Sequence, residues 1–100
     1  KYIFIYFIIK YIKIIMIYYV YLIISKKLNK YRSYVGYTNN INKRILLHNT
    51  SKGAKFTRGN TWKLIYLKKY YDKSTAMREE YKLKKNYLLR NKIKIQFLNK

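Results

Sequence analysis

Two apolar, aromatic-rich segments joined by a short basic turn constrain the fold of this chain more than any other feature. Residues 17–24 (IYYVYLII) are β-branched, aromatic or leucine, and they end at Ser25, after which lysines and asparagine mark a turn. Residues 32–37 supply a second strand. The pattern predicts a β-hairpin whose adjacent strands carry two tyrosine signatures, Tyr19-Val20-Tyr21 and Tyr34-Val35-Gly36.

A helix and a loop are predicted after the hairpin. Residues 38–40 (Thr-Asn-Asn) offer side-chain oxygens that can cap a helix N-terminus. The helix then runs to about His48, with Ile41 and Ile45 at helical spacing on the same side. Residues 49–60 hold two glycines and three basic residues, which is typical of a loop.

A third strand over residues 62–71 and a last helix complete the predicted order. Ser74 can cap this helix, which continues to about Arg90, whereas a short strand and a frayed tail fit the basic residues 91–100 equally well. The predicted fold class is therefore α+β. Residues 16–90 would form one small domain of order β-β-α-β-α, with a three-stranded mixed or antiparallel sheet flanked by helices.

The first fifteen residues stand apart from this domain. They are apolar except for lysines, and the longest apolar runs, residues 2–9 and 14–24, are eight and eleven residues long. A membrane span needs about 20, and the second run is more economically a buried strand. No small-residue cleavage site follows. We interpret Met16 as the true start and residues 1–15 as a non-native upstream extension; a membrane-associating segment is the alternative.

The charge of the chain points to a polyanionic partner. The formal net charge is +21, with 24 Lys and Arg against only three acidic residues. An A/T-rich genome would explain the abundant Lys, Ile, Asn and Tyr, but Asp and Glu also have A-rich codons, so codon bias does not explain their scarcity. Such a chain is best tolerated beside a polyanion. The absence of cysteine excludes disulfides and thiolate zinc sites.

Glu80 is the most informative acidic residue. On the last helix it shares one face with Ala76, Leu83 and Tyr87, so it is expected to point inward. A buried carboxylate must be compensated, either by a lysine or arginine or by a divalent metal. Glu79 lies about 100° round the helix and should face solvent.

The scarcity of acids also limits the metal chemistry. Two-metal phosphoryl chemistry needs several bridging carboxylates, and the chain has three acidic residues, Asp72, Glu79 and Glu80. At most one oxygen-ligated ion can be built from them. Magnesium or manganese is the natural choice for carboxylate and water ligands.

Arg44 and His48 form an i, i+4 pair, so their side chains project from one surface of the first helix. A guanidinium binds phosphate through two parallel hydrogen bonds. The plainer interpretation is a solvent-facing arginine with a histidine packed at the helix end. Tyr21 and Tyr34 lie on adjacent strands, and the hairpin could bring their hydroxyls together.

In this order and spacing, the residues resemble the GIY-YIG endonuclease family over residues 17–88. The second signature matches well, Arg44 falls at the family's essential arginine, and His48 falls where many members carry a histidine. The runs 53–58, followed by Trp62, and 76–80, followed by Lys84, resemble the small stand-alone type, which is related to structure-specific resolvase subunits and the excision-repair endonuclease. Tyr19 departs from the pattern, because the family normally has glycine there.

The resemblance implies a divalent-metal-dependent DNA endonuclease that selects DNA structure rather than sequence and acts in repair or recombination. The implied catalytic residues are Tyr21, Tyr34, Arg44, His48 and Glu80, with Glu80 holding one Mg²⁺ or Mn²⁺. A tyrosine hydroxyl would orient or deprotonate the attacking water. Because a free phenol of pKa near 10 is a poor base, Arg44 or the metal must lower its pKa. Which tyrosine does this is left open.

The implied partner is DNA, and the resolvase-type relatives also use a protein partner subunit. Phosphates of the DNA backbone would be bound by basic side chains of the first helix, the loop and the last helix: Lys43, Lys52, Lys55, Arg58 and Lys84. The alternative is a non-catalytic nucleic-acid-binding protein that keeps the fold. No membrane partner is expected, and without a secretion signal we expect an intracellular location: cytoplasm, nucleus or organelle.

Overall fold

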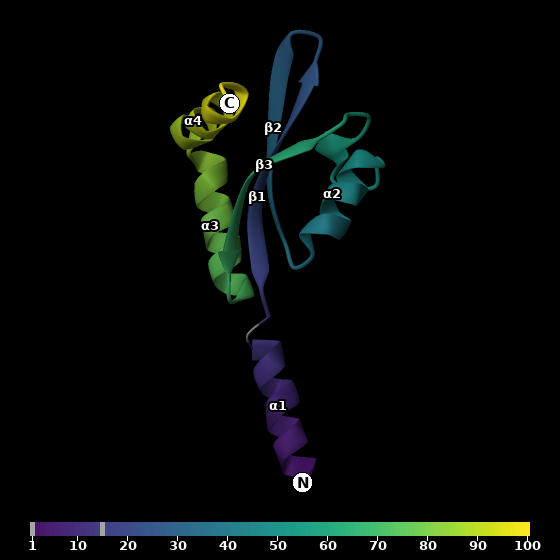
Figure 1. Cartoon of the computed structure of the whole chain (residues 1–100), viewed down its shortest axis with the longest axis vertical. Coiled ribbons are helices and arrows are strands. Elements are labelled where there is room, and N and C mark those ends of the chain that lie inside the picture. Colours follow the sequence, from purple (N-terminus) through teal and green to yellow (C-terminus); the bar gives the residue numbers. More distant parts are fainter. Residues whose placement is uncertain (1, 15) are drawn as a thin grey trace.

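The computed structural model describes residues 2–14 and 16–100, and within them the fold is α+β. A three-stranded antiparallel sheet has the strand order β2-β1-β3. Helices α3 and α4 lie along one side of the sheet and α2 along the other (Figure 1). The elements are α1 (Tyr2–Ile14), β1 (Tyr18–Lys27), β2 (Lys30–Thr38), α2 (Ile41–Asn49), the 3₁₀ helix η1 (Lys55–Thr57), β3 (Lys63–Tyr70), α3 (Lys73–Lys85) and α4 (Tyr87–Leu98).

The predicted hairpin is confirmed and is longer than expected. Strands β1 and β2 pair from Tyr19 opposite Thr38 to Lys27 opposite Lys30, so only two residues form the turn. The first of these, Leu28, has φ 57°, the left-handed conformation that tight hairpin turns require. The register places Tyr21 opposite Gly36, which aligns the two tyrosine signatures side by side.

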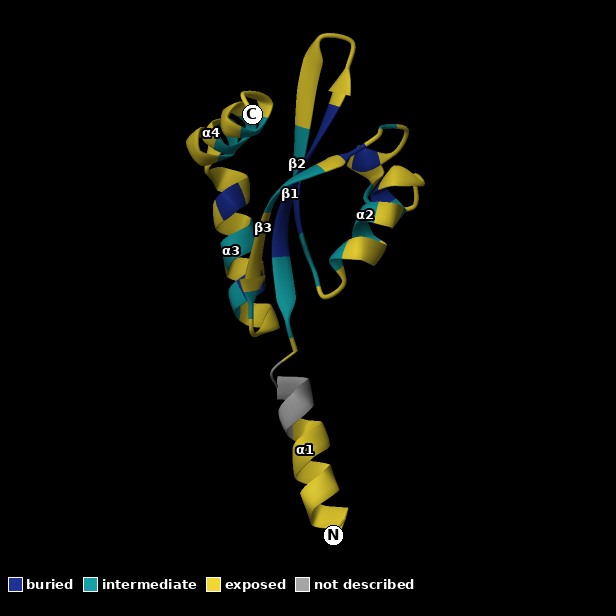
Figure 2. Cartoon of the chain, viewed as in Figure 1, coloured by how far each residue is buried: buried dark blue, intermediate teal, exposed yellow. Residues whose placement is uncertain are grey.

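Strand β1 is the centre of the core, because it is buried on both faces. Val20 and Leu22 pack with Ala76 and Leu83 of α3, while Ile23 packs with Trp62 on the other face. Figure 2 shows this strand as the most buried part of the domain, with exposed residues at the hairpin tip. Burial on both sides explains why residues 17–24 are a continuous apolar run instead of an alternating one.

The last predicted helix is in fact two helices. Asp72, not Ser74, caps α3: its Oδ1 accepts a hydrogen bond from the Thr75 amide at 2.8 Å. Helix α3 ends at Lys85, and the next residue, Asn86, caps α4 by accepting from the Leu89 amide at 3.0 Å. An asparagine side chain competes for backbone hydrogen bonds and so favours a break here. The expectation of a strand or frayed tail over residues 91–100 is therefore wrong.

This break also changes the expected inward face. Tyr87 starts α4 and is exposed instead of continuing the face of Ala76 and Leu83. The guanidinium of Arg90 secures the junction by donating hydrogen bonds to the backbone carbonyls of Leu83 and Lys84. Basic residues near a helix C-terminus stabilise its unpaired carbonyls in this way.

Helix α1 projects away from the sheet and the other helices (Figure 1). The side chains of residues 2–9 are exposed, and Lys1 and Ile15, which belong to the expected upstream extension, lie outside the described residues. Whether this extension is native stays a prediction. In the part of the chain that the structure describes, no helix is long and apolar enough to cross a bilayer.

Candidate active site

A fully buried phenol and imidazole form the centre of the candidate site. Tyr21 of β1 and His48 of α2 are both 0% exposed, and the Tyr21 hydroxyl lies 2.7 Å from Nε2 of His48. Arg44, one turn before His48 on α2, donates from Nε to the same hydroxyl at 3.4 Å. The i, i+4 spacing predicted to bring Arg44 and His48 to one surface therefore aims both side chains at Tyr21.

The hydrogen bonds around His48 define where its proton lies. The Thr57 hydroxyl donates to the Ala54 carbonyl at 2.8 Å, since a carbonyl can only accept. Its oxygen must then accept from Nδ1–H of His48, which lies 2.8 Å away. His48 therefore carries a proton on Nδ1, and in the neutral ring its Nε2 accepts the hydrogen bond from Tyr21.

The pKa shifts in this cluster agree with that assignment. Burial, and then the charge of Arg44, lowers the pKa of His48 to about 4, so the ring is neutral at pH 7. Burial raises the pKa of the Tyr21 phenol to about 12, and the hydrogen bond and charge of Arg44 lower it only in part. Arg44 thus lowers the pKa of Tyr21 in the expected direction, but burial outweighs this cation and the pKa lies above its usual value.

Tyr34 is the second phenol of the site and lies nearer the surface. Its ring packs edge-to-face against His48 with the centroids 5.1 Å apart, and it stacks on Phe56 at 6.1 Å. Tyr21 and Tyr34 both help to raise the pKa of Arg44, which remains a cation. Tyr34 is only partly buried, and it lines an open hollow of about 330 Å³ together with Phe56 and two basic residues from α3 and α4.

Glu80 lies on α3, where it is largely buried as predicted. Its side chain is 14% exposed, and its Oε1 lies 3.1 Å from Nζ of Lys84. Lys84 therefore supplies a positive charge that compensates the Glu80 carboxylate, as one of the two sequence-based alternatives expected. The negative charge of Glu80 contributes to the raised pKa of Tyr21, as the weakest of the causes. Glu79 is more exposed, at 33%, and pairs with Lys82 at 3.6 Å.

The donor set near Glu80 is compatible with one weakly anchored ion. Within residues 2–14 and 16–100, no three His, Asp or Glu side chains gather in a way that could hold a metal. Mg²⁺ commonly keeps several waters and binds through one or two carboxylates plus substrate phosphates. A single carboxylate fits that pattern, provided that Lys84 moves aside.

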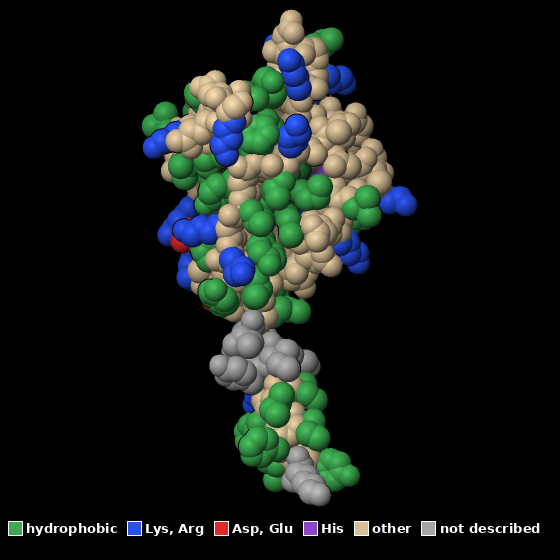
Figure 3. All heavy atoms as spheres, viewed as in Figure 1, with side chains coloured by type: hydrophobic (Ala, Val, Ile, Leu, Met, Phe, Trp, Pro, Cys, Tyr) green, Lys and Arg blue, Asp and Glu red, His purple; other side chains and the backbone are tan. Residues whose placement is uncertain are grey.

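The predicted DNA-binding residues divide into two groups. Lys43, Lys52, Lys55 and Arg58 are exposed on α2 and on the segment around η1. Lys84 lines the hollow beside Tyr34, and Arg90 joins it there. Figure 3 shows Lys and Arg side chains over the hairpin tip, α2, α3 and α4 on the visible face, and acidic side chains in one small area. Their contact with DNA stays a prediction.

Two residues essential to this geometry were missed by the sequence interpretation. Thr57 lies in the segment that the sequence predicts to be a loop, yet its side chain is fully buried and orients His48. Gly36 lies under Tyr21, where an added Cβ would be only 2.3 Å from the phenol oxygen. Gly36 belongs to the second signature and Thr57 to the run 53–58 that resembles the small stand-alone type, and these two memberships are the signals that the sequence offers.

A further tie holds the end of α2 to the start of β3. The Asn49 side chain donates from Nδ2 to the Trp62 carbonyl at 3.2 Å and accepts from the Trp62 amide at 2.6 Å. The Trp62 indole donates to the Thr57 carbonyl at 2.8 Å. These bonds fix the segment that carries Thr57 and Phe56 against the sheet.

Comparison with known proteins identifies similar chains. The model of the GIY-YIG catalytic domain matches residues 17–94. UPF0213 proteins from Oceanobacillus iheyensis and Bacillus cereus are 52% and 46% identical over 51% and 67% of this chain, which corresponds to 60% and 68% of their own length. A UPF0213 protein from Staphylococcus epidermidis is 37% identical over 69% of this chain and 84% of its own.

A solved structure is also similar. The solution NMR structure of a UPF0213 protein from Bacillus halodurans is 34% identical, covers 82% of this chain and 85% of that one, and superposes with a TM-score of 0.44.

Proposed function

Since the chain belongs to the family of the GIY-YIG catalytic domain, we propose that it is a divalent-metal-dependent DNA endonuclease that hydrolyses phosphodiester bonds. The observation that carries this proposal is the support of Arg44 by a buried network. Its Nε is held by a Tyr21 hydroxyl that is itself fixed by His48 and, through His48, by Thr57. A preorganised cation of this kind is the largest contribution that a protein makes to many reactions.

Arg44 would stabilise the charge that develops on the phosphoryl oxygens. Contact through Nε leaves the two terminal amino groups in the plane that binds phosphate bidentately. Tyr21 and His48 would act as positioning residues, because both are fully buried. Both side chains are neutral at pH 7, since the pKa of His48 lies at about 4 and that of Tyr21 at about 12. The hydrogen bonds from Tyr21 to His48 and from Arg44 to Tyr21 therefore keep the same direction at this pH.

Tyr34 is the tyrosine better suited to orient the attacking water. Its ring reaches the open hollow, where water and substrate have access, whereas Tyr21 has no exposed surface. Tyr34 is also close enough to Arg44 to raise the pKa of the guanidinium. A water held between Tyr34 and the substrate would lose its proton to solvent or to a phosphate oxygen as its new bond to phosphorus forms. The bond from phosphorus to the leaving ester oxygen would break, and that oxygen would take up a proton from solvent.

Glu80 would hold the one divalent ion, Mg²⁺ or Mn²⁺, which supplies charge stabilisation to the leaving oxygen when it is bound. Lys84, now 3.1 Å from Glu80, would turn to a backbone phosphate. In the free protein Lys84 thus neutralises the charge of Glu80. When DNA binds, Lys84 would pair with a phosphate and Glu80 would hold the metal ion. Tyr19, in place of the family glycine, does not prevent the network, because the contacts of Tyr21 form with Tyr19 present.

We further propose that the enzyme selects DNA by shape, as nucleases of DNA repair and recombination do. The basic residues Lys43, Lys52, Lys55, Arg58 and Lys84 would bind backbone phosphates, which carry no direct sequence information. Such contacts make affinity fall steeply with salt.

The direct test uses nicked, flapped and single-stranded DNA with magnesium. We expect cleavage by the native chain and its loss in Glu80→Gln and Arg44→Ala, with DNA binding retained in both. Glu79→Gln and Arg78→Ala are matched controls on α3 and should cleave normally, since these side chains contact Lys82 and Thr75 and make none of the hydrogen bonds of the Tyr21 network. Binding without cleavage by the native chain would instead favour a non-catalytic DNA-binding protein.

A further inference from the structure

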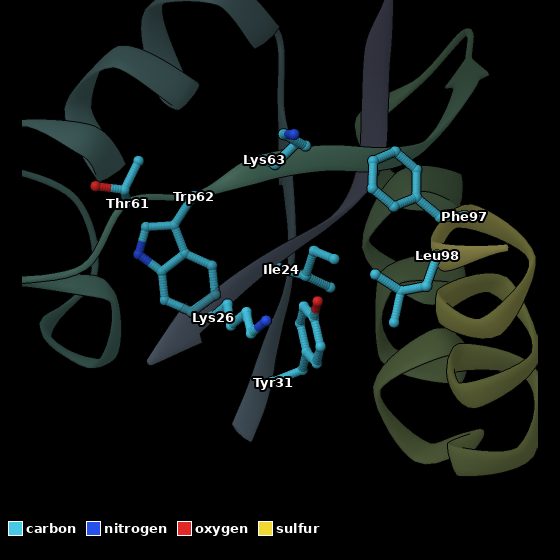
Figure 4. A pocket seen from close by; sticks show the side chains of 8 residues that line it. All are labelled: Ile24, Lys26, Tyr31, Thr61, Trp62, Lys63, Phe97 and Leu98. Atoms are coloured by element: carbon cyan, nitrogen blue, oxygen red, sulfur yellow. The ribbon is translucent and has the colours of Figure 1, made fainter. Parts of the chain in front are cut away.

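A second hollow lies away from the Tyr21 network, between the β1–β2 hairpin, the start of β3 and the end of α4. Its volume is about 400 Å³, within the roughly 300–1,000 Å³ range of small-ligand pockets. Figure 4 shows Trp62 on one side of it and Phe97 on the other, with Ile24 between them and Tyr31 below. Ile24 is 4% exposed and forms a closed apolar floor.

The walls of this pocket combine aromatic rings with lysines. Nζ of Lys63 lies 5.8 Å from the centre of the Phe97 ring, and Nζ of Lys26 lies 5.6 Å from that of Tyr31. Phe97 is partly exposed and Tyr31 is 36% exposed, so each ring keeps some surface that is open to solvent. Lysine within about 6 Å of an aromatic face is attracted to it, and the same lysines remain able to bind an anion at the rim.

An aromatic row connects this pocket to the site of Tyr34. The Tyr34 ring stacks on Phe56 at 6.1 Å, and Phe56 lies 6.2 Å from Trp62, which is a wall of the pocket. The guanidinium carbon of Arg32 lies over the Phe56 ring, 4.2 Å from its centre. Aromatic side chains interleaved with cations are the arrangement by which proteins bind single-stranded nucleic acid without reading its sequence.

We propose that this pocket binds an unpaired nucleobase of a DNA strand whose backbone runs over Phe56 toward Tyr34. The base would stack on Phe97 or Tyr31, and Lys26 and Lys63 would bind its flanking phosphates. The net charge of +21 favours a polyanion over a peptide poor in acidic residues. Among polyanions, a single-stranded nucleic acid offers flat bases to the rings and phosphates to the lysines. This assignment rests on the nuclease function proposed above and names its substrate: DNA with an unpaired arm beside the cleavage point.

Binding measured without metal separates this pocket from catalysis. Fluorescence anisotropy, with a chelator present to remove metal ions, measures the affinity of the chain for two DNAs: a blunt duplex and the same duplex with a single-stranded arm. We expect the native chain to prefer the armed DNA, and Phe97→Ala and Tyr31→Ala to lose roughly 10-fold in affinity for it, as for the loss of one stacked base. Their affinity for the blunt duplex should not change.

Controls address folding and charge. Tyr81→Ala removes an exposed tyrosine of α3 that also lies under a lysine, at 5.4 Å, and should bind both DNAs like the native chain. Lys63→Ala leaves the apolar walls intact and should flatten the dependence of log K on log salt by about 0.7 for the armed DNA. Replacing one nucleotide of the arm by an abasic one should weaken DNA binding by the native chain but should not weaken binding by Phe97→Ala.

Equal binding of both DNAs by native and variant chains would overturn the assignment, as would an equal loss for both DNAs in Phe97→Ala. The two proposals fail separately. If the pocket variants behave as expected but magnesium produces no cleavage, the nuclease function is wrong and the base pocket remains. If the native chain cleaves DNA but Phe97→Ala keeps native affinity for armed DNA, the base pocket is wrong.

Discussion

Substitution of Gly36 by alanine should displace the buried phenol on which the candidate site is built. The new methyl carbon would lie 2.3 Å from the Tyr21 hydroxyl oxygen and 2.5 Å from Cζ, whereas ordinary contacts begin at 3.4 Å. The phenol must therefore retreat by about 1 Å to reach a normal van der Waals separation. Gly36 does not have a positive φ, so alanine causes no backbone strain and the contact alone produces the effect.

The size of the expected effect follows from the bonds that this shift breaks. Tyr21 would lose its 2.7 Å contact with His48 and its 3.4 Å contact with Arg44. Misplacement of a catalytic group by 1 Å can cost about 100-fold in rate, and we expect a loss of that order through Arg44. Crowding of a packed core typically costs about 1–3 kcal/mol of stability, which also applies here.

Single-turnover cleavage of flapped DNA and urea unfolding measure these two effects. The control is Gly36→Ala in a Tyr21→Ala background, where the ring is gone and the methyl group has room. There the stability cost of Gly36→Ala should disappear. If Gly36→Ala cleaves at the native rate and unfolds at the native urea concentration, or destabilises both backgrounds equally, Tyr21 is not held against this glycine and the described network is wrong.

Three further predictions concern the support of the site. Burial lowers the pKa of His48 to about 4, so between pH 6.5 and about 4 the unfolded chain takes up a proton that the folded chain rejects. The contribution of neutral His48 to the free energy of unfolding is fully present above pH 6.5 and should fall by up to ~3 kcal/mol as the pH is lowered through this window. Urea unfolding at pH 7.5 and 4.5 should therefore show a smaller difference in stability for His48→Gln than for the native chain. Thr57→Val leaves Nδ1–H of the buried imidazole without an acceptor and should lower the free energy of unfolding by ~1–3 kcal/mol, whereas the exposed Thr61→Val should have little effect; equal unfolding curves for the two variants would contradict the assigned proton position. Asn49→Ala removes both side-chain hydrogen bonds to the start of β3 and should cost ~2 kcal/mol, with increased amide hydrogen exchange in residues 50–62; unchanged exchange there would show that other contacts hold the segment.

Much of the fold could be predicted because it is encoded in local patterns. The hairpin, the α2 boundary at Asn40 and the third strand each depend on periodicity and turn or cap residues within about ten positions. Asn40 caps α2 as expected, by accepting from the Lys43 amide at 3.1 Å. The break at Asn86 was missed because asparagine is a weak signal inside a strongly helical pattern, and its capping role depends on α4 packing nearby.

The candidate site also has a part that local sequence predicts and a part that depends on tertiary packing. The i, i+4 pairing of Arg44 with His48 and the inward direction of Glu80 are properties of a helix, and residue order alone was enough to infer them. The contact between Tyr21 and His48 joins residues 27 positions apart, and it depends on how α2 packs over the sheet. Thr57 reaches His48 from a segment that tertiary contacts hold in place, among them the hydrogen bonds of Asn49 and Thr57 with Trp62.

Charge and chemical type could thus be assigned from residues, but proton positions and acidities could not. The pKa of a phenol depends on whether burial or a neighbouring cation dominates, and this balance is set by how closely the surrounding groups pack. For Tyr21 the packing excludes water more strongly than Arg44 compensates, so its pKa rises. A periodic pattern specifies which side of an element faces the core, whereas the solvent left around each atom is known only once all elements are assembled.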